Sequence, residues 1–198
     1  MSDTTTIKQI FTKGAGYART ADVLAAGIHF SQLKKLEEAG VITKIKRGHY
    51  RWEGMAYWGG ELPEIARLAP SGVFCLFTAA EYHNLTTYQP WQHHLAVERS
   101  MKVTGLPAGR VKMHYWSGPL LEFGIEIIQT EGGPIRLTDA ARTVCDLVKY
   151  RNKTGMDTML EAIRAYLRRK DKNLTLLLEY ARRLRVEKVI RPYLEMAI

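Results

Sequence analysis

The sequence predicts an α+β protein: an N-terminal winged helix-turn-helix is followed by a mixed α/β region that ends in a small helical bundle. Three observations predict this fold. Short helical patterns punctuated by glycines come first, an alternating strand pattern follows them, and the chain after residue 138 carries only helical apolar stripes. With 46% apolar and 25% charged residues, the composition is that of a folded globular protein.

Three short helices are predicted before residue 41. Residues 6–13 carry apolar side chains at helical spacing, and Gly14 ends this helix. Thr20 is placed to cap a second helix, which ends at Gly27. The third helix ends at Gly40, and its expected buried stripe is Phe30, Leu33, Leu36 and Ala39. Two short helices joined by a tight, glycine-containing turn are typical of a helix-turn-helix, whose second helix enters the major groove.

The third helix and the segment after it both present cations. With its apolar stripe inward, the helix turns outward the residues expected to contact bases, which are Ser31, Gln32, Lys34 and Lys35. Residues 41–52 alternate apolar and polar side chains around a turn at Arg47-Gly48, which predicts a β-hairpin wing. The wing residues expected to contact phosphates or the minor groove are Lys44, Lys46, Arg47, His49 and Arg51. Tyr50 and Trp52 are expected to pack the wing on the helices. DNA binding is favoured over the alternative in which the same fold contacts only protein.

Glycine and proline residues between 59 and 72 predict a domain boundary. The predicted organisation is a winged helix-turn-helix DNA-binding domain over residues 1–55, a linker over 56–70 with a short helical stretch at 63–68, and a C-terminal α+β domain over 71–198. In that domain Ser71 is expected to cap a helix over residues 73–84. Strands are predicted at 93–98, 111–116 and 125–135, the last folded at Gly132-Gly133. Thr138 is expected to open a helix to about Tyr150.

Three further helical stripes follow without an intervening strand, which predicts the terminal bundle. Many cations stand between the apolar positions of these helices. Five of them are predicted to be unengaged and to contact a partner: Arg164, Arg168, Arg169, Arg182 and Arg183. A charged helix face is usually only solvated, but this density favours an acidic protein or a nucleic acid as the partner.

The formal net charge is +9, and it is divided unevenly along the chain. Residues 1–60 hold nine Lys and Arg against five Asp and Glu, residues 61–150 eight against nine, and residues 151–198 twelve against six. Two basic ends suit a polyanion such as DNA. No N-terminal signal pattern or apolar run of roughly 20 residues occurs, so the expected location is the cytoplasm, without membrane contact.

The sequence predicts that the protein is not an enzyme and that it binds neither a metal ion nor a cofactor. Four histidines, His83, His93, His94 and His114, lack a cysteine at zinc-ligand spacing, and Cys75 and Cys145 lie in apolar runs that favour buried thiols. Carboxylates near strands leave one alternative, a DNA-binding module fused to a metal-dependent or degenerate nuclease-like domain; the residues concerned are Glu122, Glu126 and Glu131.

The order of several motifs resembles one family across nearly the whole chain. The N-terminal segments that carry the resemblance are ARTAD at 18–22, LKKLEEAG at 33–40 and KRGHY at 46–50. The later ones are LFTAAEYHNLTT at 76–87, HHLAV at 93–97, TDAARTVCDL at 138–147 and YRNKTG at 150–155. These segments resemble the AbiEi-type antitoxins, transcriptional regulators of abortive-infection operons that protect bacteria from phage.

This resemblance implies an antitoxin that represses its own operon and counters a toxin of the nucleotidyltransferase type. The system is called type IV because antitoxin and toxin need not form a stable complex. The implied partners are a double-stranded DNA operator, expected as repeated sites in the chain's own promoter, and that toxin.

Overall fold

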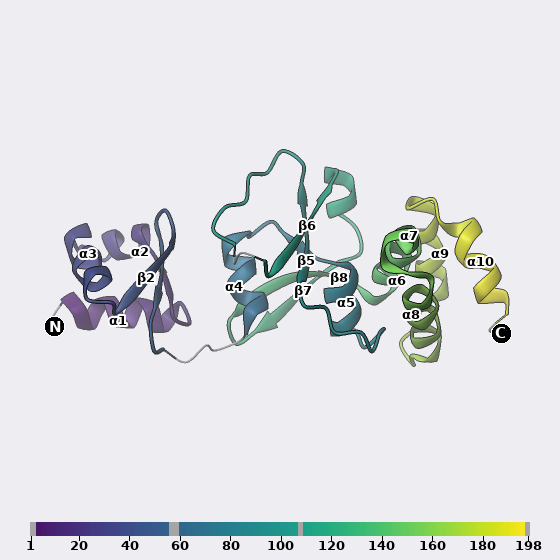
Figure 1. The fold of residues 1–198 in the computed structure, drawn as a ribbon, viewed down its shortest axis with the longest axis horizontal. Helices are drawn as coiled ribbons and strands as arrows, with labels where there is room; N and C mark the ends of the chain where they lie inside the picture. Colours follow the sequence, from purple (N-terminus) through teal and green to yellow (C-terminus); the bar gives the residue numbers. More distant parts are fainter. Residues whose placement is uncertain (1–2, 56–59, 107–108, 197–198) are drawn as a thin grey trace. The chain divides into compact units, whose positions relative to one another are not determined.

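The computed structural model describes residues 3–55, 60–106 and 109–196, and these residues form two compact units with a mixed α and β composition (Figure 1). Unit 1 contains Met1–Leu68 together with Val103–Gly105 and Gln129–Pro134. Unit 2 contains Ala69–Lys102, Leu106–Ile128 and Ile135–Ile198. The α+β composition predicted from the sequence is therefore confirmed.

Unit 1 combines short helices with a small antiparallel sheet. Its elements are α1 (Asp3–Lys13), β1 (Tyr17–Arg19), α2 (Thr20–Ala25), α3 (Phe30–Glu38), β2 (Ile42–Lys46), β3 (His49–Trp52) and α4 (Glu61–Leu68). The sheet order is β1-β3-β2. Strand β1 has only three residues, too few to show an alternating pattern in the sequence.

One apolar core holds the first three helices and this sheet together. Ile7, Phe11, Val23, Leu33 and Tyr50 are buried in it. The Trp52 ring meets Phe11 edge-on, with ring centroids 5.3 Å apart, so the predicted packing of Tyr50 and Trp52 on the helices is confirmed.

Three local expectations for unit 1 were wrong. Ala39, expected in the buried stripe of the third helix, is exposed where α3 ends. Phe30 is 42% exposed, because it opens α3 and Ile28 of the preceding turn occupies the core instead. Helix α2 is capped by Arg19 rather than Thr20, since the Asp22 carboxylate bonds back to the Arg19 main chain and guanidinium.

Unit 2 pairs a five-stranded sheet with a set of helices. Its first elements are β4 (Val73–Phe74), α5 (Leu76–Tyr82), β5 (His93–Glu98), β6 (Val111–Trp116), the 3₁₀ helix η1 (Gly118–Leu121), β7 (Ile125–Thr130) and β8 (Gly133–Thr138). The helices α6 (Ala140–Lys149), α7 (Arg151–Thr154), α8 (Met156–Arg168), α9 (Leu174–Arg183) and α10 (Glu187–Glu195) follow. The sheet order is β6-β5-β4-β8-β7, with β5 and β6 parallel.

Helix α6 lies at the centre of unit 2, where every residue from Ala141 to Val148 is buried. Side chains from α8, α9 and α10 share its core, and Figure 1 shows these helices gathered together at one end of the unit. The Arg142 guanidinium is fully buried and forms an ion pair with Asp146 at 3.0 Å. It also donates to the Phe123 carbonyl at 2.9 Å and lies over the Phe123 ring.

The strands predicted at 93–98 and 111–116 match β5 and β6. The helix predicted from residue 73 was wrong at its start. Val73 and Phe74 form strand β4, because they pair with Ala96 and Leu95 of β5, and the helix begins at Leu76. A buried apolar run does not distinguish these two structures by pattern alone. Asp139 rather than Thr138 caps α6, since Thr138 closes β8.

The segment predicted as a linker, residues 56–70, contains helix α4 (Glu61–Leu68), which agrees with the predicted helical stretch inside it. Residues 56–59 of that segment lie outside the described residues. The first unit extends through Leu68, and Ala69 begins the second unit.

Candidate nucleic-acid interface

Helix α3 presents a polar side opposite its buried Leu33. His29 caps the helix by accepting from the Ser31 main-chain N–H at 3.2 Å. Ser31, Lys34 and Lys35 are exposed, and Gln32 is partly exposed. Lys34 reaches Glu38 at 3.7 Å, but the side chains are 67% and 65% exposed, and such pairs are weak. Lys35 makes no ion pair within the described ranges. The start of α3 therefore presents donors to solvent, as predicted.

The hairpin of β2 and β3 adds further exposed cations. A register irregularity between Lys44 and Lys46 interrupts the pairing of these strands. Lys44 and Arg47 are exposed and engage no acidic side chain in the part of the chain that the structure describes. His49 is half-buried, and its Nδ1 lies 3.2 Å from the Arg47 carbonyl oxygen.

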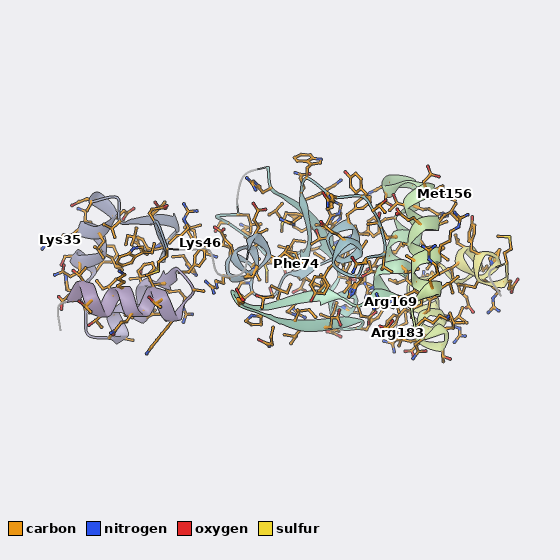
Figure 2. All side chains as sticks on the ribbon, turned by 90° about the horizontal axis from the view of Figure 1, so that it is seen from below. Lys35, Lys46, Phe74, Met156, Arg169 and Arg183 are labelled. Atoms are coloured by element: carbon orange, nitrogen blue, oxygen red, sulfur yellow. The ribbon has the colours of Figure 1, made fainter. Side chains whose placement is uncertain are left out.

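Two other predicted wing residues have partners inside unit 1. The Lys46 ammonium donates to the Leu68 carbonyl at the end of α4 over 2.8 Å, and partial burial holds its pKa below the ordinary value. Arg51 pairs with Glu53 at 2.8 Å and lies 4.0 Å from Glu64 of α4. Figure 2 shows Lys35 and Lys46 on opposite sides of the part of unit 1 that α1 to β3 form. Of the hairpin cations, Lys44 and Arg47 thus face solvent, whereas Lys46 and Arg51 have partners within unit 1.

The five arginines predicted as partner contacts in unit 2 fall into two groups. Arg164 and Arg168 are exposed and line a depression of about 290 Å³ along α8, together with Asp157, Leu160 and Glu161. Glu161 accepts from the Thr87 main-chain N–H at 2.7 Å and from the Thr86 hydroxyl at 2.9 Å. Arg164 and Arg168 form no ion pair among the described residues.

The other three arginines are engaged, so the expectation that all five are unengaged was wrong. Arg169 donates to the His83 carbonyl at 2.9 Å and pairs with Asp171 at 2.8 Å. Arg182 lies 3.3 Å from Glu187, and Arg183 lies 2.7 Å from Glu179. Each acidic partner comes from the same helix or from the segment that follows it. The apolar stripes, on which the prediction was based, carry no information about these ion pairs.

The residues behind the nuclease alternative do not assemble into a centre. Glu126 approaches His83, with Oε1 and Nε2 3.2 Å apart. Over residues 3–55, 60–106 and 109–196, no group of three or more His, Cys, Asp and Glu side chains is arranged to hold a metal ion. Cys75 and Cys145 are buried, unbridged thiols, and burial raises both pKa values. None of the described helices has the length and apolarity needed to cross a membrane.

Comparison with known proteins finds a family model that matches part of unit 1 and a solved structure with a similar fold. Residues 6–51 match the family model described as a transcriptional regulator, AbiEi antitoxin. No curated protein matches the sequence. Among solved structures, the RV2827C protein from Mycobacterium tuberculosis is similar, with a TM-score of 0.57 and 12% sequence identity. The alignment covers 88% of this chain and 70% of that protein, which establishes a shared fold.

Proposed function

We propose that this chain, whose residues 6–51 match the AbiEi family of antitoxins and transcriptional regulators, is a cytoplasmic repressor of its own operon and an antitoxin. Unit 1 acts as a winged helix-turn-helix on double-stranded DNA. Unit 2 counters a toxin of the nucleotidyltransferase type and carries out no catalysis of its own. Repeated operator sites in the promoter provide a binding site for more than one copy of unit 1.

The observation that carries the DNA-binding role is the set of exposed polar side chains at the start of α3 and on the hairpin after it. Lys34 and Lys35 of α3 and Lys44 and Arg47 of the hairpin are all exposed. All four lie within the matched residues 6–51. Helix cations are suited to base edges in the major groove, and hairpin cations are suited to phosphates.

The antitoxin role is supported by the α8 depression. Arg164 and Arg168 stand one helical turn apart, at positions i and i+4, so their guanidinium groups lie on one face of α8. Because no carboxylate in the described part of the chain pairs with them, an acidic surface of the toxin gains two new ion pairs without breaking existing ones. Arg182 and Arg183 are less suited, since each already holds a glutamate.

The DNA-binding role is tested with the full chain on a duplex that carries its own promoter. Specific, salt-sensitive binding in the presence of a chelator, with the duplex left intact when magnesium is added, is the expected result. Metal-dependent nicking that disappears in Glu126→Gln would instead make the chain a nuclease.

The antitoxin role is tested by co-expression with the neighbouring toxin gene. The full chain is expected to rescue growth, whereas Arg164→Gln/Arg168→Gln is expected to lose rescue while still repressing its promoter. The matched control is Arg182→Gln/Arg183→Gln, which removes the same charge and should rescue normally. Equal rescue by both double variants would refute the assignment to α8.

A further inference from the structure

The chain between α5 and β5 presents two large aromatic side chains to solvent. Trp91 is 74% exposed, and Tyr88 is 47% exposed. Tryptophan is usually covered in a folded protein, because its ring is the largest apolar surface that a side chain offers. An exposed tryptophan therefore needs an explanation in terms of a partner or a loosely held segment.

The segment is not loosely held, because interactions fix it on both sides of Trp91. The Tyr88 main-chain N–H donates to the Thr86 hydroxyl at 3.1 Å, and the Tyr88 ring packs on Phe77 with centroids 4.9 Å apart. After Trp91, the side-chain amide of Gln92 donates from Nε2 to the Gly109 carbonyl oxygen at 3.0 Å. The Trp91 ring is therefore presented from a fixed backbone.

Basic residues lie beside this segment because β5 and β6 run parallel. His93, the first residue of β5, stands opposite Val111, the first residue of β6, and its N–H donates to the Arg110 carbonyl at 2.8 Å. Trp91 and Arg110 are thus brought to the same end of two neighbouring strands. One step further, exposed Lys112 stands opposite His94 and makes no ion pair within the described ranges.

The surroundings contain few carboxylates. The sequence has no Asp or Glu between Glu81 and Glu98, and none between Glu98 and Glu122. Glu161, which accepts from Thr86 and Thr87, contributes one negative charge beside this segment. Arg110 and Lys112 therefore meet no carboxylate from residues 82–97 or 99–121, the stretches that form this end of the sheet.

We propose that Trp91, Tyr88 and Lys112 form a binding surface for single-stranded nucleic acid, with bases stacked on the exposed rings and a backbone phosphate at Lys112. Aromatic side chains beside cations are the combination that binds single strands, because the faces of unpaired bases are accessible. Bases inside a duplex have no free face to offer. This surface lies in unit 2, so the proposal goes beyond operator binding and does not depend on it.

The test measures anisotropy of a fluorescein-labelled oligo(U) and, separately, of a duplex, each with the full chain. Trp91→Ala is expected to weaken oligo(U) binding roughly 5- to 150-fold, the range for losing one base–aromatic stack. Lys112→Gln should flatten the dependence of log K on log salt by about 0.7, the value for one phosphate contact on a single strand. Both variants should bind the duplex like the parent chain.

The matched control is Tyr115→Ala, which removes another exposed aromatic, 56% exposed, from the opposite face of β6. It should leave oligo(U) binding unchanged, and circular dichroism should show all variants folded. The proposal is overturned if oligo(U) does not bind at low salt, or if Trp91→Ala binds it as tightly as the parent. Unchanged oligo(U) binding with weakened capture of the toxin by Trp91→Ala would mean that the surface contacts protein instead.

Discussion

The Lys46 ammonium donates a hydrogen bond to the main-chain carbonyl of Leu68 over 2.8 Å, which ties the hairpin to the last residue of α4. A cation at a helix C-terminus also interacts favourably with the helix dipole. Arg47, the next residue, is exposed and engages no acidic side chain within the described ranges. Two adjacent cations of one hairpin therefore have different surroundings, although the sequence makes them look equivalent.

This difference predicts that two alanine variants differ in the salt dependence of duplex binding. Arg47→Ala should weaken binding to all duplexes alike and lower the salt slope by about 0.9, because one phosphate contact is lost. Lys46→Ala should leave the salt slope unchanged. Binding titrations at several salt concentrations measure both slopes. A lower slope in Lys46→Ala would show that this side chain leaves Leu68 to meet DNA.

Lys35 is predicted to contribute to sequence discrimination. Its side chain is exposed on α3, where groove-entering helices contact base edges. Lys35→Ala should reduce the difference in binding free energy between operator and random duplex by about 1 to 3 kcal/mol. The same reduction is expected for Gln32→Ala if it makes a bidentate contact with a base. Competition titrations measure the specificity ratio; a ratio intact in both variants would exclude base contacts by this helix.

Removal of one partner from the buried pair of Arg142 and Asp146 is predicted to lower the free energy of unfolding strongly. The two side chains are 0% and 1% exposed, and burial raises the pKa of Asp146 to about 6 despite the guanidinium beside it. Asp146→Asn should lower the free energy of unfolding by about 3 to 5 kcal/mol, since it leaves a buried charge without its partner. Arg182→Gln, which breaks the exposed pair with Glu187, should cost less than about 1 kcal/mol. Urea unfolding of both variants checks this contrast, and similar losses would contradict it.

His94 is predicted to make unit 2 less stable in acid. Burial, followed by the positive charges of neighbouring side chains, lowers its pKa to about 3. The unfolded chain takes up the proton below about pH 6.5, whereas the folded chain does not, so stability declines as pH falls from 6.5 towards 3. At pH 5 the loss from this residue is about 2 kcal/mol.

His114, whose Nε2 lies 3.2 Å from His94 Nδ1, contributes in the same direction, since burial lowers its pKa to about 4, whereas Asp146 acts in the opposite direction. Comparison with His94→Gln therefore gives the His94 contribution as a difference between two pH profiles. The Asp146 pKa of about 6 lies above its unfolded value, so its contribution to stability rises as pH falls below 6. The free energy of unfolding should therefore fall more steeply between pH 7 and pH 5 in the parent chain than in His94→Gln. Parallel pH profiles would mean that His94 is protonated in the folded state.

Much of the local structure followed from sequence pattern alone. Glycines and apolar spacing predicted α1, α2 and α3, and alternation predicted the hairpin of β2 and β3. The strand over residues 93–98 was also predicted with its bounds, because alternation and turn residues are local signals. The start of α5 was missed, since Val73 and Phe74 became a strand only by pairing with residues more than 20 positions away.

The sequence by itself determined most of the segments that form helices and strands and which of them carry cations, because periodicity and charge are properties of neighbouring residues. Only the tertiary structure decided which cations are accessible. Lys46 meets the end of α4, Arg169 meets the carbonyl of His83, and Arg164 remains exposed, although all three occur in similarly basic segments. The reason is physical: the partners of Lys46 and Arg169 are main-chain carbonyls, which every residue carries, so only folding selects the one that accepts the bond.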